Sequence, residues 1–162
     1  MEKEYSISEI YGNDKSAIIT QKIRYEKLKN KFSEVFGYKP YEFFSSPGRT
    51  EISGNHTDHN RGKVIAASIN LDSIAAAAKH NEHIKIFSDG YESPFEVDLN
   101  KLEICKSESG TTTALIRGIA AGFKQKGYKI GGFEAFITSD VLQGSGLSSS
   151  ASVEVLIGTI LN

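Results

Sequence analysis

Three segments of the chain place apolar residues on one face of a helix. Residues 16–36, 112–126 and 148–161 show this spacing, which is typical of helices that pack against a core. Gly37 and Gly127 follow the first two segments, where glycine commonly ends a helix. The apolar positions include Ile19, Ile23, Leu28, Phe32, Val35, Leu115, Ile119, Phe123, Val153, Leu156, Ile157 and Ile160. We therefore predict three helices.

Six shorter segments are apolar and rich in residues that favour strands. They are residues 41–45, 63–69, 73–79, 84–87, 95–99 and 133–138. We expect turns at Pro47-Gly48 and at Asp89-Gly90, because such pairs are common in turns. The alanine run 75–78 suits a helix by propensity, but its place between strand-like stretches favours a buried strand.

The predicted elements mix helices and strands with no internal repeat and no linker, which indicates a single α/β domain over residues 1–162. The last predicted helix is apolar, and no later strand follows to bury it. We therefore expect these residues to be one part of a longer protein.

Composition excludes several classes of protein. The net charge of the 162 residues is −1, so we expect no broad attraction to nucleic acid or to acidic membranes. The basic stretch 22–31 has helical spacing and reads as a solvated helix face. The N-terminus is polar, and no apolar run approaches the roughly 20 residues of a membrane span. The single cysteine, Cys105, fits a reducing compartment, so we expect a cytoplasmic protein.

A glycine-serine loop joins the last predicted strand to the last predicted helix. Residues 141–153 read V-L-Q-G-S-G-L-S-S-S-A-S-V. Loops of this kind direct backbone N–H groups at phosphate, at the positive end of a helix dipole. No lysine follows the glycines, as a Walker A loop requires, and the third glycine of a dinucleotide fingerprint is replaced by Ser149. A serine-capped helix without a ligand is the alternative.

A second polar segment spans residues 46–62, with two residues each of His, Asn and Arg, two acids and three glycines. Such density suits a polyhydroxylated ligand, with Asp58, His56 and Asn55 as hydrogen-bonding groups. Arg49, which we place after the Pro47-Gly48 turn, could serve a phosphoryl group.

Two other interpretations of this segment stay open: a polar surface loop, and a zinc site. His56, Asp58 and His59 are residues of zinc-binding type, but their spacing matches no standard zinc set. We expect His80 and His83 to lie in a turn between strands, and we assign them no role.

Together the two segments resemble the signatures of the galactokinases, members of the GHMP family of small-molecule kinases. The galactokinase signature runs approximately G-R-V-N-L-I-G-E-H-T-D-Y-N-x-G, and residues 48–62 read G-R-T-E-I-S-G-N-H-T-D-H-N-R-G. The phosphate loop of the family runs approximately P-x-G-x-G-L-S-S-S-A-S, and residues 142–152 read L-Q-G-S-G-L-S-S-S-A-S. The resemblance implies a GHMP kinase N-terminal domain, similar to domain 2 of ribosomal protein S5, with a mixed sheet and helices on one side.

The resemblance also implies a kinase that uses ATP and Mg²⁺ to phosphorylate the anomeric hydroxyl of galactose, with the sugar and ATP as its small-molecule partners. Arg49 would stabilise the transition state, Ser88 would line the nucleotide pocket, and Ser150 would help to hold Mg²⁺. The implied sugar-binding residues are Asn55, His56, Thr57 and Asp58. The implied ATP-binding loop residues are Gly144, Ser145, Gly146, Leu147, Ser148, Ser149 and Ser150. The catalytic base of the family follows the phosphate loop, so we expect these 162 residues alone to be inactive.

Several residues depart from the family pattern. Asn55 replaces a glutamate, His59 a tyrosine, Glu51 an asparagine and Leu142 a proline, and the chain has no tryptophan. These changes leave two alternatives to a galactose kinase: a sensor that binds galactose and ATP without turnover, and a kinase for another hexose such as N-acetylgalactosamine. No feature of the sequence sets the oligomeric state.

Overall fold

The computed structural model describes residues 5–54, 61–142, 144 and 146–162. Its strands form one five-stranded sheet in the order β1-β2-β5-β3-β4. β3 and β5 run parallel, and the other neighbours run antiparallel. The strands are β1 Glu42–Ser53, β2 Ile65–His80, β3 His83–Ser88, β4 Phe95–Asp98 and β5 Gly132–Ser139. The α-helices are α1 Ile7–Tyr11, α2 Lys15–Phe36, α3 Thr112–Gln125 and α4 Ser149–Leu161. The predicted mixed α/β fold is confirmed.

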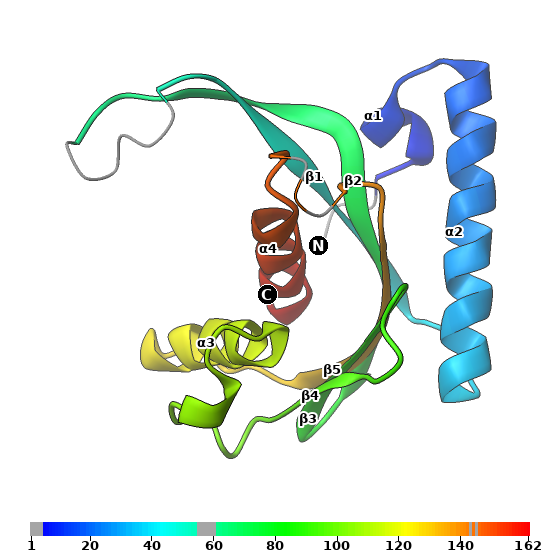
Figure 1. Cartoon of the computed structure of the whole chain (residues 1–162). Coiled ribbons are helices and arrows are strands. Elements are labelled where there is room, and N and C mark those ends of the chain that lie inside the picture. The colour runs from blue at the N-terminus through cyan, green and yellow to red at the C-terminus, as the bar shows by residue number, and fades with distance from the viewer. Residues whose placement is uncertain (1–4, 55–60, 143, 145) are drawn as a thin grey trace.

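Helices cover both faces of this sheet, so the prediction of helices on one side is wrong. α2 lies against one face, and α3 and α4 lie against the other (Figure 1). Side chains along a strand point alternately to the two faces. In β2, Ala75 and Ala77 belong to the core beneath α3 and α4, whereas Ala76 and Ala78 pack with Leu28 of α2. Each face carries apolar residues that pack against helices.

The three predicted helices are confirmed, and their ends have clear causes. The Asp14 side chain accepts a hydrogen bond from the N–H of Ala17 at the start of α2, and Gly37 ends that helix in the left-handed conformation, with φ of 78°. The short helix α1 was not predicted, although Ser6 and Glu9 form a capping box that the sequence displays. Within the described residues, no helix is long and apolar enough to cross a membrane.

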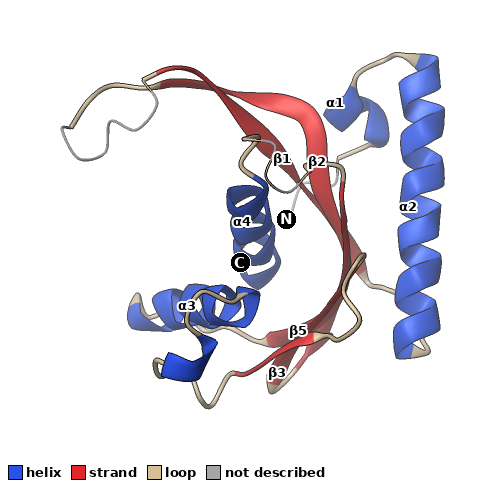
Figure 2. Ribbon diagram, viewed as in Figure 1, coloured by secondary structure: helices blue, strands red, loops and turns tan. Residues whose placement is uncertain are grey.

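Two strand predictions are corrected. β1 runs through Pro47-Gly48, where we predicted a turn, and β2 is continuous from residue 65 to residue 80, where we predicted two strands (Figure 2). The pairing of β1 with β2 shifts its register between Pro47 and Arg49, so the chain bends within a strand. Proline lacks an N–H group and is tolerated where a ladder is interrupted. The alanine run is confirmed as a buried strand.

The β2–β3 connection crosses the start of β5 at Gly132, and we predict that this crossing requires a residue without a side chain. A β-carbon at this position would lie 2.1 Å from the carbonyl oxygen of His83. Gly132→Ala should therefore lower the free energy of unfolding by about 1–3 kcal/mol, as overpacking does. Urea denaturation measures this change. The matched control is Gly118→Ala in α3, where an added β-carbon meets no atom within 4 Å. An equal loss in both variants would contradict the prediction.

Candidate nucleotide and sugar site

The two sequence motifs meet in the structure. Arg49 lies in β1, and its backbone N–H donates to the carbonyl oxygen of Leu147 in the glycine-serine loop at 3.0 Å. A β-carbon on the neighbouring Gly48 would lie 2.9 Å from the same carbonyl oxygen and 3.1 Å from Val141. Arg49 therefore follows a bend within a strand rather than the predicted turn. The absence of a side chain at Gly48 lets the loop approach β1 this closely.

Buried hydroxyl groups fix the first turn of α4 to the sheet. The Ser152 hydroxyl donates to the carbonyl oxygen of Ser46 at 2.8 Å and is hydrogen-bonded to Ser73 Oγ at 2.9 Å. Ser73 Oγ in turn lies 2.8 Å from Ser139 Oγ, which accepts from the N–H of Val141 at 3.1 Å. The chain of hydroxyls joins β1, β2 and β5 to both ends of the loop. Sequence analysis did not assign a role to Ser152 or its partners.

Three described residues of the glycine-serine loop adopt positive φ values. Gly144 and Gly146 have φ values of 75° and 76°, and Ser148 has φ of 62°. Glycine adopts these values without strain, whereas serine does so at a cost of about 1–3 kcal/mol. Ser148 is the N-cap residue of α4, yet its side chain makes no capping hydrogen bond. The alternative of an ordinary serine cap is therefore not supported at Ser148, and the start of α4 suits an anion.

A pocket of about 270 Å³ opens beside the start of α4. Ser149 and Ser150 line it from α4, Ser88 lines it from the end of β3, and Thr112 lines it from α3. The remaining walls are mainly apolar, and they include Ile86, Tyr91, Phe95, Leu115, Ile116, Ile137, Val153 and Ile157. The structure thus brings Ser88 together with the last serines of the loop. A largely apolar pocket with a few polar groups suits a small organic ligand.

The predicted sugar-binding residues Asn55, His56, Thr57 and Asp58 lie outside the described residues, as do His59 of the zinc alternative and Ser145 of the loop. The structure does describe the two chain segments that lead into this stretch. A β-carbon on Gly54 would lie 2.3 Å from the carbonyl oxygen of Lys63. Residues 54 and 63 are therefore in contact at the end of the β1–β2 pair.

Two protein-family models match the chain. One describes the galactokinase galactose-binding signature and matches residues 30–79, and the other describes the GHMP kinases N terminal domain and matches residues 114–162. Galactokinases of Streptococcus suis and Lactococcus lactis are 41% and 36% identical over 139 and 138 residues. Each alignment covers 83% of this chain and 35% of the relative, so the chain spans about a third of the length of these curated proteins.

Solved structures agree with the sequence comparisons. The crystal structure of Lactococcus lactis galactokinase complexed with galactose matches with a TM-score of 0.76 at 36% identity, over 85% of this chain and 36% of that chain. The Methanococcus jannaschii mevalonate kinase matches with a TM-score of 0.60 at 17% identity, over 75% of this chain and 39% of that chain, which shows the fold alone.

This chain therefore carries a galactokinase galactose-binding signature followed by a GHMP kinase N-terminal region. The family resemblance that the two motifs indicated is confirmed.

This GHMP kinase domain supports its loop with a buried ion pair that sequence analysis missed. The Arg24 guanidinium of α2 pairs with the buried carboxylate of Asp72 and lies 3.2 Å from Asp140 Oδ2. The N–H of Asp140 donates to the carbonyl oxygen of Asp72 at 3.0 Å. Asp140 directly precedes the loop, so the ion pair holds the loop's first residues against β2. Arg24 and Asp72 are 48 residues apart and share no motif.

Hydroxyl groups complete the surroundings of Asp72. Tyr11 and Ser45 both donate to Asp72 Oδ2. Burial, followed by the hydrogen bond to Asp72, raises the pKa of the Tyr11 hydroxyl far above its ordinary value. Tyr11 therefore stays a neutral donor, and the short helix α1 is tied to β2.

Replacing Arg24 should destabilise the fold, because the buried carboxylate of Asp72 would lose its cation. Arg24→Met removes the cation and leaves the carboxylate buried, so the free energy of unfolding should fall by about 3–5 kcal/mol. Lys22→Met, at an exposed position of the same helix, should change it by less than about 0.5 kcal/mol. Urea denaturation of both variants measures the difference. Similar values for the two variants would contradict this account of the ion pair.

Proposed function

We propose that the protein containing this chain is a galactokinase, which transfers the γ-phosphoryl group of ATP to the anomeric hydroxyl of galactose. The observation that supports the proposal most is the hydrogen bond from the N–H of Arg49 to Leu147. It joins the segment that resembles a sugar-binding signature to the segment that resembles a phosphate loop. A kinase needs such contact, because its two substrates must meet within bonding distance.

The nucleotide is proposed to bind across the pocket and the loop. The base would occupy the largely apolar pocket beside Ser88, and the phosphates would lie at the start of α4, along Gly144 to Ser150. Backbone N–H groups and the helix dipole favour the negative charge there. Ser145 is part of the proposed loop by its place in the sequence.

A magnesium ion is proposed to accompany the nucleotide. Mg²⁺ prefers oxygen ligands and commonly keeps several waters beside substrate phosphates. Ser150 offers a hydroxyl in the first turn of α4 and lines the pocket, which fits such an ion. When bound, Mg²⁺ would neutralise part of the phosphate charge.

Arg49 is proposed to stabilise the transferred phosphoryl group. Its backbone N–H contacts the loop at Leu147, and its half-exposed guanidinium pairs with Glu51, with Nη2 3.0 Å from Oε1. The anomeric oxygen of the sugar would form a bond to the γ-phosphorus as the bond to the β–γ bridging oxygen breaks, and ADP would leave. The residues proposed to orient the sugar are Asn55, His56, Thr57 and Asp58.

The family pattern places the base that accepts the hydroxyl proton after the phosphate loop, and we propose that the whole protein supplies it there. Residues 1–162 would then form the N-terminal domain of the kinase. A single cysteine and the use of ATP fit a cytoplasmic location, which is part of the same proposal.

Arg49→Met should lower kcat of the whole protein for galactose by about a thousandfold, the lower end of the range for arginines that stabilise phosphoryl transfer. KM for galactose should change little, because Arg49 is assigned to the phosphoryl group rather than to the sugar. Arg61→Met removes the same charge from an exposed position of the same motif and should keep the wild-type kcat. Coupled ADP release measures both variants.

A panel of hexoses tests the substrate class. Galactose should give the highest kcat/KM. A higher kcat/KM for N-acetylgalactosamine would identify that sugar as the substrate in place of galactose. Binding of galactose and ATP in calorimetry, without release of ADP, would favour a sensor over an enzyme.

A further inference from the structure

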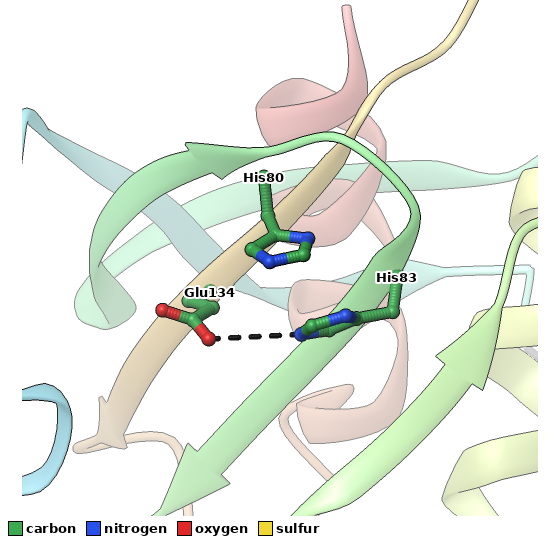
Figure 3. Close-up of side chains that lie close together, drawn as sticks. All are labelled: His80, His83 and Glu134. Atoms are coloured by element: carbon green, nitrogen blue, oxygen red, sulfur yellow. Dashed lines mark ion pairs between the residues drawn. The ribbon is translucent and has the colours of Figure 1, made fainter.

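Two histidines and a glutamate come together on the face of the sheet that α2 covers, beyond the end of that helix (Figure 3). His80 ends β2, His83 begins β3, and Glu134 lies in β5 between them. Glu134 is two residues from Phe136, which packs with α2, so both side chains point to the same face. Three adjacent strands thus contribute one side chain each.

The backbone around Gly132 explains why the histidines meet. The connection from β2 to β3 is only Asn81-Glu82, and it crosses the first residue of β5. Gly132 admits this crossing because a β-carbon there would lie 2.1 Å from the carbonyl oxygen of His83. As a result, the imidazole rings of His80 and His83 lie with their centroids 3.7 Å apart and their planes tilted by 38°.

The distances suit a small metal ion. His83 Nε2 lies 3.6 Å from Glu134 Oε1, close to the edge of about 3.3 Å between two ligands of a tetrahedral zinc ion with bonds of about 2.0 Å. One ligand atom from each of the three residues lies within 4.8 Å of the others. A rotation of the His80 side chain would close the remaining gap. That rotation changes the ring contact with His83 and gives up a long hydrogen bond of 3.4 Å from the N–H of Glu82 to His80 Nδ1.

A tyrosine orients the carboxylate. The Tyr38 hydroxyl, just after α2, donates to Glu134 Oε2 and leaves Oε1 facing His83. A tyrosine hydroxyl is a hydrogen-bond donor, whereas an ionised carboxylate only accepts, which fixes the direction of this contact. Partners of this kind commonly hold metal-binding carboxylates in place.

We propose that His80, His83 and Glu134 bind a divalent transition-metal ion, of which Zn²⁺ is the best match. Two imidazole nitrogens and one carboxylate oxygen favour zinc-like ions over Mg²⁺, so this site is separate from the one proposed for Mg²⁺ at Ser150. The bound ion would link the β2–β3 connection to β5, with a water or another ligand completing its coordination. The site does not depend on the proposed kinase activity. It also revises our expectation that the two histidines have no role.

The chain offers a matched control, because its four histidines form two pairs with the same spacing: His56 with His59, and His80 with His83. We would first replace the exposed thiol with Cys105→Ser. One variant then carries His80→Gln and His83→Gln, and the other carries His56→Gln and His59→Gln. Zn²⁺ alone is titrated into each by calorimetry, Co²⁺ absorption reports tetrahedral coordination, and circular dichroism verifies folding.

The variant without His56 and His59 should bind one Zn²⁺ per chain and show the strong visible bands of tetrahedral Co²⁺. The variant without His80 and His83 should lose this binding. Tyr38→Phe, which keeps all three ligands, should weaken Zn²⁺ binding by about tenfold. Should the loss of His80 and His83 perturb folding, Glu134→Gln tests the same ligand set. The proposal would be overturned if Zn²⁺ affinity were unchanged in the variant without His80 and His83 or in Glu134→Gln. Loss of Zn²⁺ binding in the variant without His56 and His59 would also overturn it.

Discussion

The hydrogen bond from the N–H of Arg49 to the carbonyl oxygen of Leu147 holds the proposed site together. It depends on the bare α-carbon of Gly48, because any side chain there would collide with Leu147. Through this contact, a strand near the start of the chain and a loop near its end share one surface. The position of Arg49 beside the glycine-serine loop follows from the backbone alone, and its half-exposed side chain pairs with Glu51.

Buried polar groups keep both partners of that contact in place. Small residues along β2 let α4 approach the sheet, and the Ser152 hydroxyl satisfies the carbonyl oxygen of Ser46 in the space they leave. On the other face, Arg24 offsets the buried charge of Asp72 and reaches Asp140 at the start of the loop. Buried polar groups of this kind specify one arrangement, because displacing any of them leaves a partner without a hydrogen bond.

Local patterns predicted much of the fold. Helical spacing predicted α2, α3 and α4, and the unbroken burial of Ala75 to Ala78 follows from a strand with helices on both faces. The same alanine run argues against a sheet with helices on one side only, because apolar and polar residues do not alternate along it. The turn predicted at Pro47-Gly48 was wrong, because proline and glycine also occur where the register shifts within a strand. Ser152, Arg24 and the contact of Glu134 with the histidine pair depend on distant segments coming together, which spacing along the chain does not encode.

Gly48→Ala tests most directly whether the two motifs form one site. The added methyl group should force β1 away from Leu147, so calorimetry on the whole protein should find weaker binding of both ATP and galactose. Gly118→Ala, where nothing lies within 4 Å of the added carbon, should leave both affinities unchanged. Wild-type affinity of Gly48→Ala for ATP, with or without a change for galactose, would contradict the claim that the loop and β1 act together.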